Sequence, residues 1–113
     1  MVARNKLLDA PPYSVEQVLK RLGDDLRTAR IRRNYTVEDV AEKIGTGRRA
    51  VMGAEKGKPS TGIGTYTALL WLYEMLQPLE DLANPANDEL GITLAAAKAR
   101  TRASKGRGLD NDF

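Results

Sequence analysis

Residues 35–58 read YTVEDVAEKIGTGRRAVMGAEKGK, and this stretch decides the fold. It predicts two short helices joined by a tight glycine turn. Thr36 is a favoured N-cap residue, and Asp39 three positions later completes the reciprocal capping pattern. Gly45 is expected to end the first helix, because a helix commonly ends in a positive φ that glycine tolerates best. The second helix is expected over residues 48–56.

The second helix has two different faces. Its inward face is small and apolar, formed by Ala50, Val51 and Ala54, and its outward face carries Arg48, Arg49, Met52 and Lys56. Two helices in this arrangement predict a helix-turn-helix, in which the second helix enters the major groove of DNA. The alternative is an ordinary αα-hairpin, which would not explain the outward arginines.

Residues 22–58 resemble the Cro/repressor-type (Xre) DNA-binding domain. The resemblance is carried by the helix-turn-helix, by the pattern L-G-x-x-L-R-x-x-R ahead of it and by E-K-G-K at its end. It implies that residues at the start of the second helix read DNA bases. The fold expected is all-α, a small bundle of about five helices with a flexible N-terminal arm and a basic, disordered C-terminal tail.

The candidate base-contacting residues are Arg48, Arg49, Met52 and Gly53. The planar fork of arginine matches guanine O6 and N7, methionine offers apolar contact to a thymine methyl, and glycine permits close approach. The candidates for phosphate contact are the basic residues and the helix starts, namely Arg33, Thr36, Val37, Gly47, Lys56 and Lys58.

Two features leave the strength of sequence recognition open. Val37 stands where many repressors carry a DNA-contacting glutamine, and Gly47 is a weaker cap than the usual serine-like residue. The arginines at the end of the preceding helix are also open to two interpretations. Arg30, Arg32 and Arg33 would complement the helix dipole there, or they would reach DNA phosphates.

The whole chain is expected to divide into four parts. Residues 1–12 are expected to form a flexible arm, and residues 13–83 a DNA-binding domain that begins with a helix from Ser14 as N-cap to about Arg33. Residues 84–102 are expected to form a C-terminal helical segment, although Ile92 and Thr93 leave a strand open. Residues 103–113 are interpreted as disordered, because they are polar and contain glycine.

A further helix is expected over residues 63–76, and it is apolar nearly all round. A helix with two apolar faces is buried on both. We therefore expect one face to meet the core and the other, with Trp71, Leu72 and Met75, to contact a second subunit or another partner. The alternative is a contact within the chain only.

The charges are sorted into blocks. Residues 27–58 hold nine basic and four acidic side chains, residues 59–97 hold five acids with no Lys or Arg, and residues 98–108 hold five basic side chains and no acid. Such blocks suggest separate partner surfaces, and the basic ones suit the phosphates of DNA. Chance clustering on a solvated surface is the alternative.

The composition argues against several functions. The chain has no cysteine and no histidine, which excludes thiol and imidazole chemistry and Cys/His zinc sites. Glu38 and Asp39 are explained as first-turn dipole and capping residues, so no enzyme, cofactor or metal is expected. No run approaches the roughly 20 apolar residues that span a bilayer, and no export signal is evident. We therefore expect a cytoplasmic protein.

Residues 18–100 are also similar, more loosely, to the HipB-like antitoxins encoded beside HipA-like kinases. That resemblance implies a homodimer that represses its own operon and keeps a serine/threonine-kinase toxin inactive. The alternative is a standalone or prophage-type Xre transcriptional regulator without a toxin. A protein-interaction module that no longer binds DNA is a third possibility.

Overall fold

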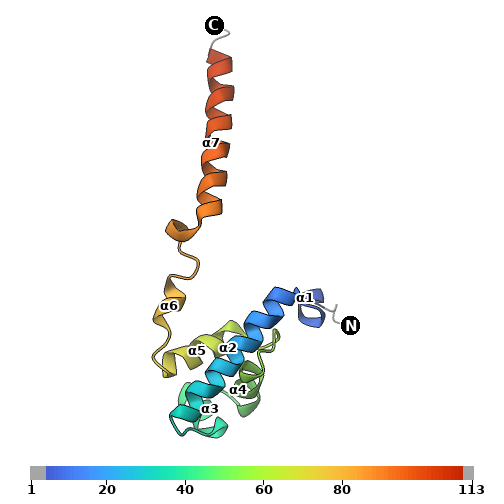
Figure 1. Ribbon diagram of the computed structural model, residues 1–113, viewed down its shortest axis with the longest axis vertical. Coiled ribbons are helices and arrows are strands. Elements are labelled where there is room, and N and C mark those ends of the chain that lie inside the picture. The colour runs from blue at the N-terminus through green and yellow to red at the C-terminus, as the bar shows by residue number, and fades with distance from the viewer. Residues whose placement is uncertain (1–4, 111–113) are drawn as a thin grey trace. The chain divides into compact units, whose positions relative to one another are not determined.

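The computed structural model describes residues 5–110, with side chains described through residue 105, and all its regular structure is helical (Figure 1). The chain divides into two compact units, of which the first ends at Leu76 and the second begins at Gln77. Because all the regular structure of the described residues is helical, the all-α prediction is confirmed. The division falls earlier than the domain boundary expected after residue 83.

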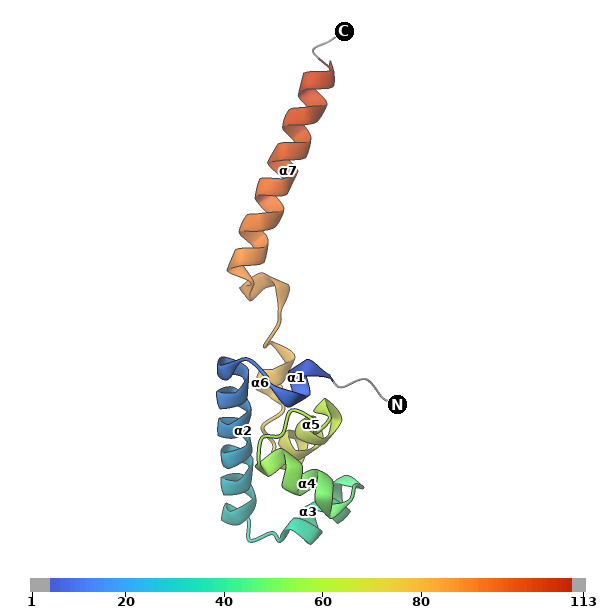
Figure 2. The same cartoon turned by 90° about the vertical axis from the view of Figure 1, so that its right-hand side faces the viewer.

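Within the described residues, the first unit contains five helices, which are α1 (Lys6–Asp9), α2 (Tyr13–Arg32), α3 (Val37–Ile44), α4 (Arg48–Glu55) and α5 (Ile63–Leu72). The long helix α2 lies along one side of the unit, and α3, α4 and α5 gather on its other side (Figure 2). Helix α4 packs against α2, α3 and α5. The core is formed by the buried residues Leu26, Ala29, Val40, Ala41, Val51, Ala54, Tyr66, Leu69 and Tyr73.

Two glycines let α2 approach the end of α4. A Cβ at Gly23 would lie 2.6 Å from the carbonyl oxygen of Glu55 and 2.7 Å from that of Ala54. A Cβ at Gly57 would collide with the backbone of Leu19. Gly23 therefore allows α2 to pack closely against the end of α4, and α2 is one continuous helix across this glycine, as predicted.

Four helices end in a residue with positive φ. In α3 this residue is the C-cap, Gly45, and in α2, α4 and α5 it directly follows the C-cap, as Asn34, Gly57 and Glu74. After α5 the amide of Met75 donates to the carbonyl of Leu70 at 2.7 Å, and that of Glu74 donates to the carbonyl of Trp71 at 3.1 Å. This pair of bonds defines the Schellman motif.

Several expected boundaries differ from the structure. Part of the N-terminal arm forms the single turn α1, because Asn5 caps it by accepting from the amide of Leu7 at 3.0 Å. Helix α2 starts at Tyr13 after Pro12, so Ser14 is not its N-cap. Helix α5 ends at Leu72 and not at residue 76, because Glu74 turns the chain into the left-handed region. Residues 1–4 of the arm lie outside the described residues.

The second unit contains α6 (Gln77–Glu80), a 3-10 turn over Pro85–Asn87 and the long helix α7 (Glu89–Asp110). Helix α7 removes the strand alternative, and it also covers residues 103–110, which were expected to be disordered. The run of alanine, lysine and arginine after Leu94 explains its length, since these are strong helix formers. Residues 111–113 of the predicted tail lie outside the description. Among the described residues, no helix has the length and apolar character needed to cross a membrane.

Candidate nucleic-acid interface

The outward face of α4 is as predicted, and of the three residues predicted to face inward, two are buried and Ala50 is half-buried. Val51 and Ala54 are completely buried, whereas Arg48, Arg49, Met52 and Lys56 are exposed. The capping box ahead of α3 is also confirmed, with Thr36 Oγ1 accepting from the amide of Asp39 at 3.0 Å. Gly45 has the expected left-handed φ of 75° at the turn. The capping box and the turn thus fix the two helices so that the arginines face outward.

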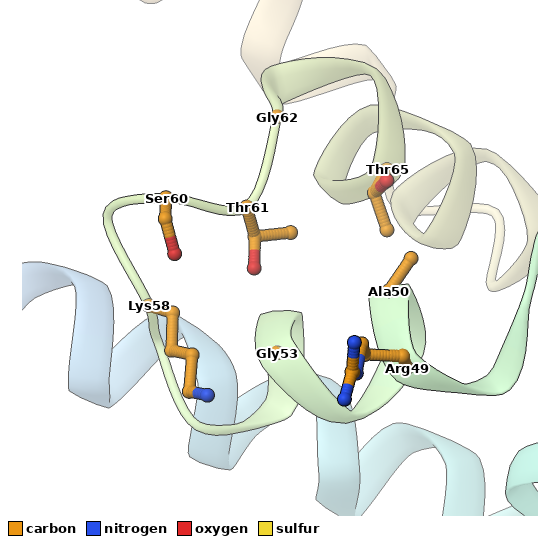
Figure 3. A pocket seen from close by; sticks show the side chains of 8 residues that line it. All are labelled: Arg49, Ala50, Gly53, Lys58, Ser60, Thr61, Gly62 and Thr65. Atoms are coloured by element: carbon orange, nitrogen blue, oxygen red, sulfur yellow. The ribbon is translucent and has the colours of Figure 1, made fainter. Parts of the chain in front are cut away.

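Two hollows lie along the exposed side of α4. The first has a volume of about 470 Å³ and lies between α4 and the start of α5, lined by Arg49, Ala50, Gly53, Lys58, Ser60, Thr61, Gly62 and Thr65 (Figure 3). The second has a volume of about 500 Å³ and is lined by Arg48, Arg49, Met52, Lys56 and Lys58. All the charged side chains that line these hollows are basic.

The loop after α4 forms one wall of the first hollow and is held in place by hydrogen bonds. The carbonyl oxygen of Lys58 accepts from the Tyr66 hydroxyl at 2.9 Å and from the amide of Thr61 at 3.1 Å. Burial of Tyr66 raises the pKa of its hydroxyl, which stays a donor at neutral pH. The backbone of Lys58 is therefore fixed while its side chain remains exposed.

Gly53 has a different place from the one expected. It is buried, and a Cβ there would lie 2.5 Å from Thr61 Oγ1 (Figure 3). The glycine thus lets the loop close over α4 and does not lie on the outer surface of the helix with the arginines.

Ser60, Thr61 and Thr65 were not predicted as site residues. Ser60 and Thr61 point hydroxyl groups into the hollow that Arg49 and Lys58 also line, whereas Thr65 turns its methyl group toward it (Figure 3). The sequence feature that could have indicated these residues is the run of serine, threonine and glycine directly before a helix. This composition suits an anion site at a helix N-terminus.

The starts of the three helices differ in how well they suit a phosphate. Helices α4 and α5 follow Gly47 and Gly62, which make no side-chain cap, and neither helix has an acid in its first turn. Helix α3 carries Glu38 and Asp39 there. Hydrogen bonds from Thr36 hold the pKa of Asp39 below its usual value, so this end of α3 stays negatively charged.

Because the helix starts differ in this way, the residues predicted to contact phosphate fall into two groups. Gly47, Lys56 and Lys58 lie on the side of the molecule that carries the arginines of α4. The amide and hydroxyl of Thr36 are engaged with Asp39, and Val37 is half-buried against the core. The negative charge and these contacts make the start of α3 a poorer phosphate site than the starts of α4 and α5.

Arg33 is held by the protein itself. Its guanidinium donates to the carbonyl oxygens of Ala29 at 2.9 Å and Tyr73 at 3.1 Å, and lies 5.1 Å from the centre of the Tyr73 ring. Of the two interpretations of Arg33, the structure favours the one in which it stabilises helix ends, since it caps the last carbonyls of both α2 and α5.

Arg30 also has a structural role. It makes two hydrogen bonds to the Glu55 carboxylate, at 2.7 and 3.1 Å, and donates to the carbonyl of Tyr35 at 2.9 Å. The hydrogen bonds with Glu55 raise the pKa of Arg30. This pair ties the ends of α2 and α4 together. Because both side chains are largely buried, neither charge is available to a ligand.

Arg48 has an exposed acidic neighbour. Its Nε lies 3.3 Å from a carboxylate oxygen of Glu38, and the two side chains are 64% and 63% exposed. Such exposed pairs contribute less than about 1 kcal/mol, so DNA can displace the carboxylate at little cost. Arg49 has no ion pair among the described residues and is free to meet a ligand.

The apolar residues expected to contact a partner are on the surface of the first unit. Trp71 is 61% exposed and Met75 is 46% exposed, whereas Leu72 is half-buried. Tryptophan and methionine are enriched in the cores of protein interfaces, so this surface suits contact with a second subunit or another partner.

Comparison of the chain with models of protein families, with curated proteins and with solved structures gives no significant match. Among the described residues, no cluster of acidic side chains is suited to holding a metal ion. The case for a function therefore rests on the sequence and on the geometry of α4.

Proposed function

We propose that this protein binds double-stranded DNA through α4 and acts as a sequence-specific transcriptional repressor. The observation that carries the proposal is the outer face of α4. There Arg48 and Arg49 are exposed at the first turn of a helix that the capping box and Gly45 hold in a fixed orientation. A major groove about 12 Å wide admits one such helix, and arginine is the side chain that most often reads guanine there.

The surroundings of α4 supply contacts to the DNA backbone. Lys56, Lys58 and the hydroxyl-lined hollow at the start of α5 flank the arginines. On either side of a groove-bound helix lie the phosphates of the two strands, and these groups offer charge and hydrogen-bond donors to them. In this assignment Arg48, Arg49 and Met52 reach bases, while Lys58, Ser60 and Thr61 bind phosphate.

We further propose that the protein works as a homodimer in the cytoplasm. The exposed Trp71 and Met75, with the half-buried Leu72, present apolar surface that a second copy would cover. A two-fold axis between the copies would direct two α4 helices toward successive turns of the duplex.

The finer role as an antitoxin rests on the looser resemblance of residues 18–100 to the HipB-like antitoxins. In that role the protein would also bind and inhibit a HipA-like kinase encoded beside it. An adjacent reading frame for a kinase-like protein would favour this role, and its absence would favour a standalone regulator.

The test is DNA binding by variants of α4. A duplex from upstream of the gene is titrated with wild-type protein and with Arg48→Ala and Arg49→Ala, in the presence of excess unrelated DNA. We expect each substitution to weaken binding about 5- to 150-fold, the value of one bidentate guanine contact. Arg21→Ala and Arg27→Ala, on exposed positions of α2, are the matched controls and should change affinity less than about threefold, as expected where no base is contacted. An equal loss of DNA affinity in the α4 variants and the α2 controls, or no loss in either, would contradict the proposal.

A further inference from the structure

Helix α7 carries a dense group of positive charges. Lys98, Arg100, Arg102 and Lys105 are all exposed, and none forms an ion pair or a hydrogen bond through its side chain with another described residue. No acidic residue lies between Glu89 and Lys105. We call residues 98–105 the basic segment of α7.

The charge density of this segment is close to that of a DNA strand. A helix rises about 1.5 Å per residue, so the four charges are spaced roughly 3.5 Å apart along the axis. Each strand of a duplex carries one phosphate per about 3.4 Å. The segment therefore suits a linear polyanion better than an isolated acidic group.

Its other residues argue against a protein or membrane partner. Between the charges the segment has only alanine, threonine and serine. The large apolar residues of α7 whose side chains are described, which are Leu90, Ile92 and Leu94, lie at least one turn before it. A protein interface needs large side chains at its centre, and a membrane-surface helix needs an apolar face opposite its charges.

The charges also lie on both sides of the helix. Lys98, Arg102 and Lys105 are spaced four and three residues apart and share one side, whereas Arg100 lies on the opposite side. A helix of this kind makes contacts on both sides when it lies in a groove whose two walls are lined by phosphates.

We propose that the basic segment of α7 is a second DNA-contacting element, which binds phosphates without reading sequence. This proposal rests on the proposed function, because it assigns a further contact to the same ligand. The element would add affinity for DNA of any sequence, while discrimination would come from α4.

The test compares salt dependence in full-length proteins. A fluorescent duplex of mixed sequence, about three helical turns long, is titrated at several KCl concentrations with wild type, with Lys98→Gln/Arg102→Gln/Lys105→Gln and with Arg48→Ala/Arg49→Ala. The slope of log K against log salt decreases by about 0.9 for each phosphate that the protein no longer neutralises, so we expect the α7 triple variant to reduce it by about two to three units. A control triple variant, Lys6→Gln/Arg21→Gln/Arg27→Gln, removes the same charge from exposed positions of α1 and α2 and should change the slope by less than about one unit.

The outcomes separate the two proposals. A slope that is unchanged in the α7 triple variant, or reduced equally in the control, overturns the α7 contact. If the α4 variant alone weakens binding, the proposed function stands without this element. If the α7 variant alone does so, the α7 contact stands, and base recognition by α4 is decided by the upstream duplex and the variants Arg48→Ala and Arg49→Ala. Circular dichroism verifies that each variant keeps its helix content.

Discussion

The first unit contains two buried tyrosines, and only one of the two hydroxyls has a hydrogen-bond partner among the described residues. The Tyr66 hydroxyl donates to the carbonyl of Lys58, which holds the loop beside α4. The Tyr73 hydroxyl is buried and has no such partner in the described part of the chain. Burial raises the pKa of both, and raises that of Tyr73 to about 12. The same substitution should therefore have different effects at the two sites.

We expect Tyr66→Phe to lower the free energy of unfolding by about 1 kcal/mol, the net value of one hydrogen bond. Tyr73→Phe should leave it unchanged or raise it, because that substitution removes a buried polar group with no partner. Urea unfolding of both variants at neutral pH measures the difference. A larger decrease in Tyr73→Phe than in Tyr66→Phe would contradict the hydrogen bonding described.

The Tyr73→Phe variant should also differ from wild type in alkali. The pKa of Tyr73 is raised from 10.0 to about 12 in the folded state, so the stability that this group contributes is complete below pH 10.0 and decreases as the pH rises toward 12. Because phenylalanine cannot ionise, the variant should lose less stability than wild type over this range. Urea unfolding across the range measures it, and parallel decreases in the two proteins would contradict the raised pKa.

At the scale of the helices, local residue preferences predicted most of the architecture. Gly45 was expected to end a helix because glycine tolerates a positive φ best, and it adopts one. Gly57 and Asn34, whose residue types also tolerate this conformation, adopt it after α4 and α2. Glu74 adopts it as well, but glutamate gives no such signal. The early end of α5 was therefore missed.

The parts of the site that were missed depend on contacts between distant residues. Arg33 meets the carbonyl of Tyr73, 40 residues away, and Gly53 meets Thr61 across the loop. Neither contact leaves a periodic pattern in the sequence. By contrast, the exposed positions of Arg48 and Arg49 follow from helical spacing alone, and these were predicted.

The close approach of α2 to α4 gives a test at this scale. Gly23→Ala would place a methyl group 2.6 Å from the carbonyl oxygen of Glu55, so the two helices must separate. We expect a loss of roughly 1–3 kcal/mol of stability, typical of overpacking. Gly64→Ala is the matched control, because its added methyl meets no atom within 4 Å. It should stabilise the protein by about 0.5–1 kcal/mol. Thermal unfolding of the pair measures both changes, and similar melting temperatures would contradict the packing.

At the scale of the whole molecule, the proposals divide DNA binding between the two units. The first unit would supply base recognition through α4 and the apolar residues for dimerisation. The second would supply phosphate contacts through the basic segment of α7. The sequence already showed these charges in separate blocks and predicted a helical segment through residue 102. It did not show that the helix continues past Lys105, and this continuation determines the spacing of all four charges.

DNA recognition by α4 can be measured by selecting bound sequences from a random duplex pool with the wild-type protein and with Arg48→Ala and Arg49→Ala. For wild type we expect an inverted repeat whose half-sites are about 10 base pairs apart, centre to centre, with a guanine in each half-site. Each arginine variant should lose preference at one position of the half-site and keep the others. Failure to enrich any sequence, or the same motif from wild type and both variants, would contradict recognition of DNA by α4.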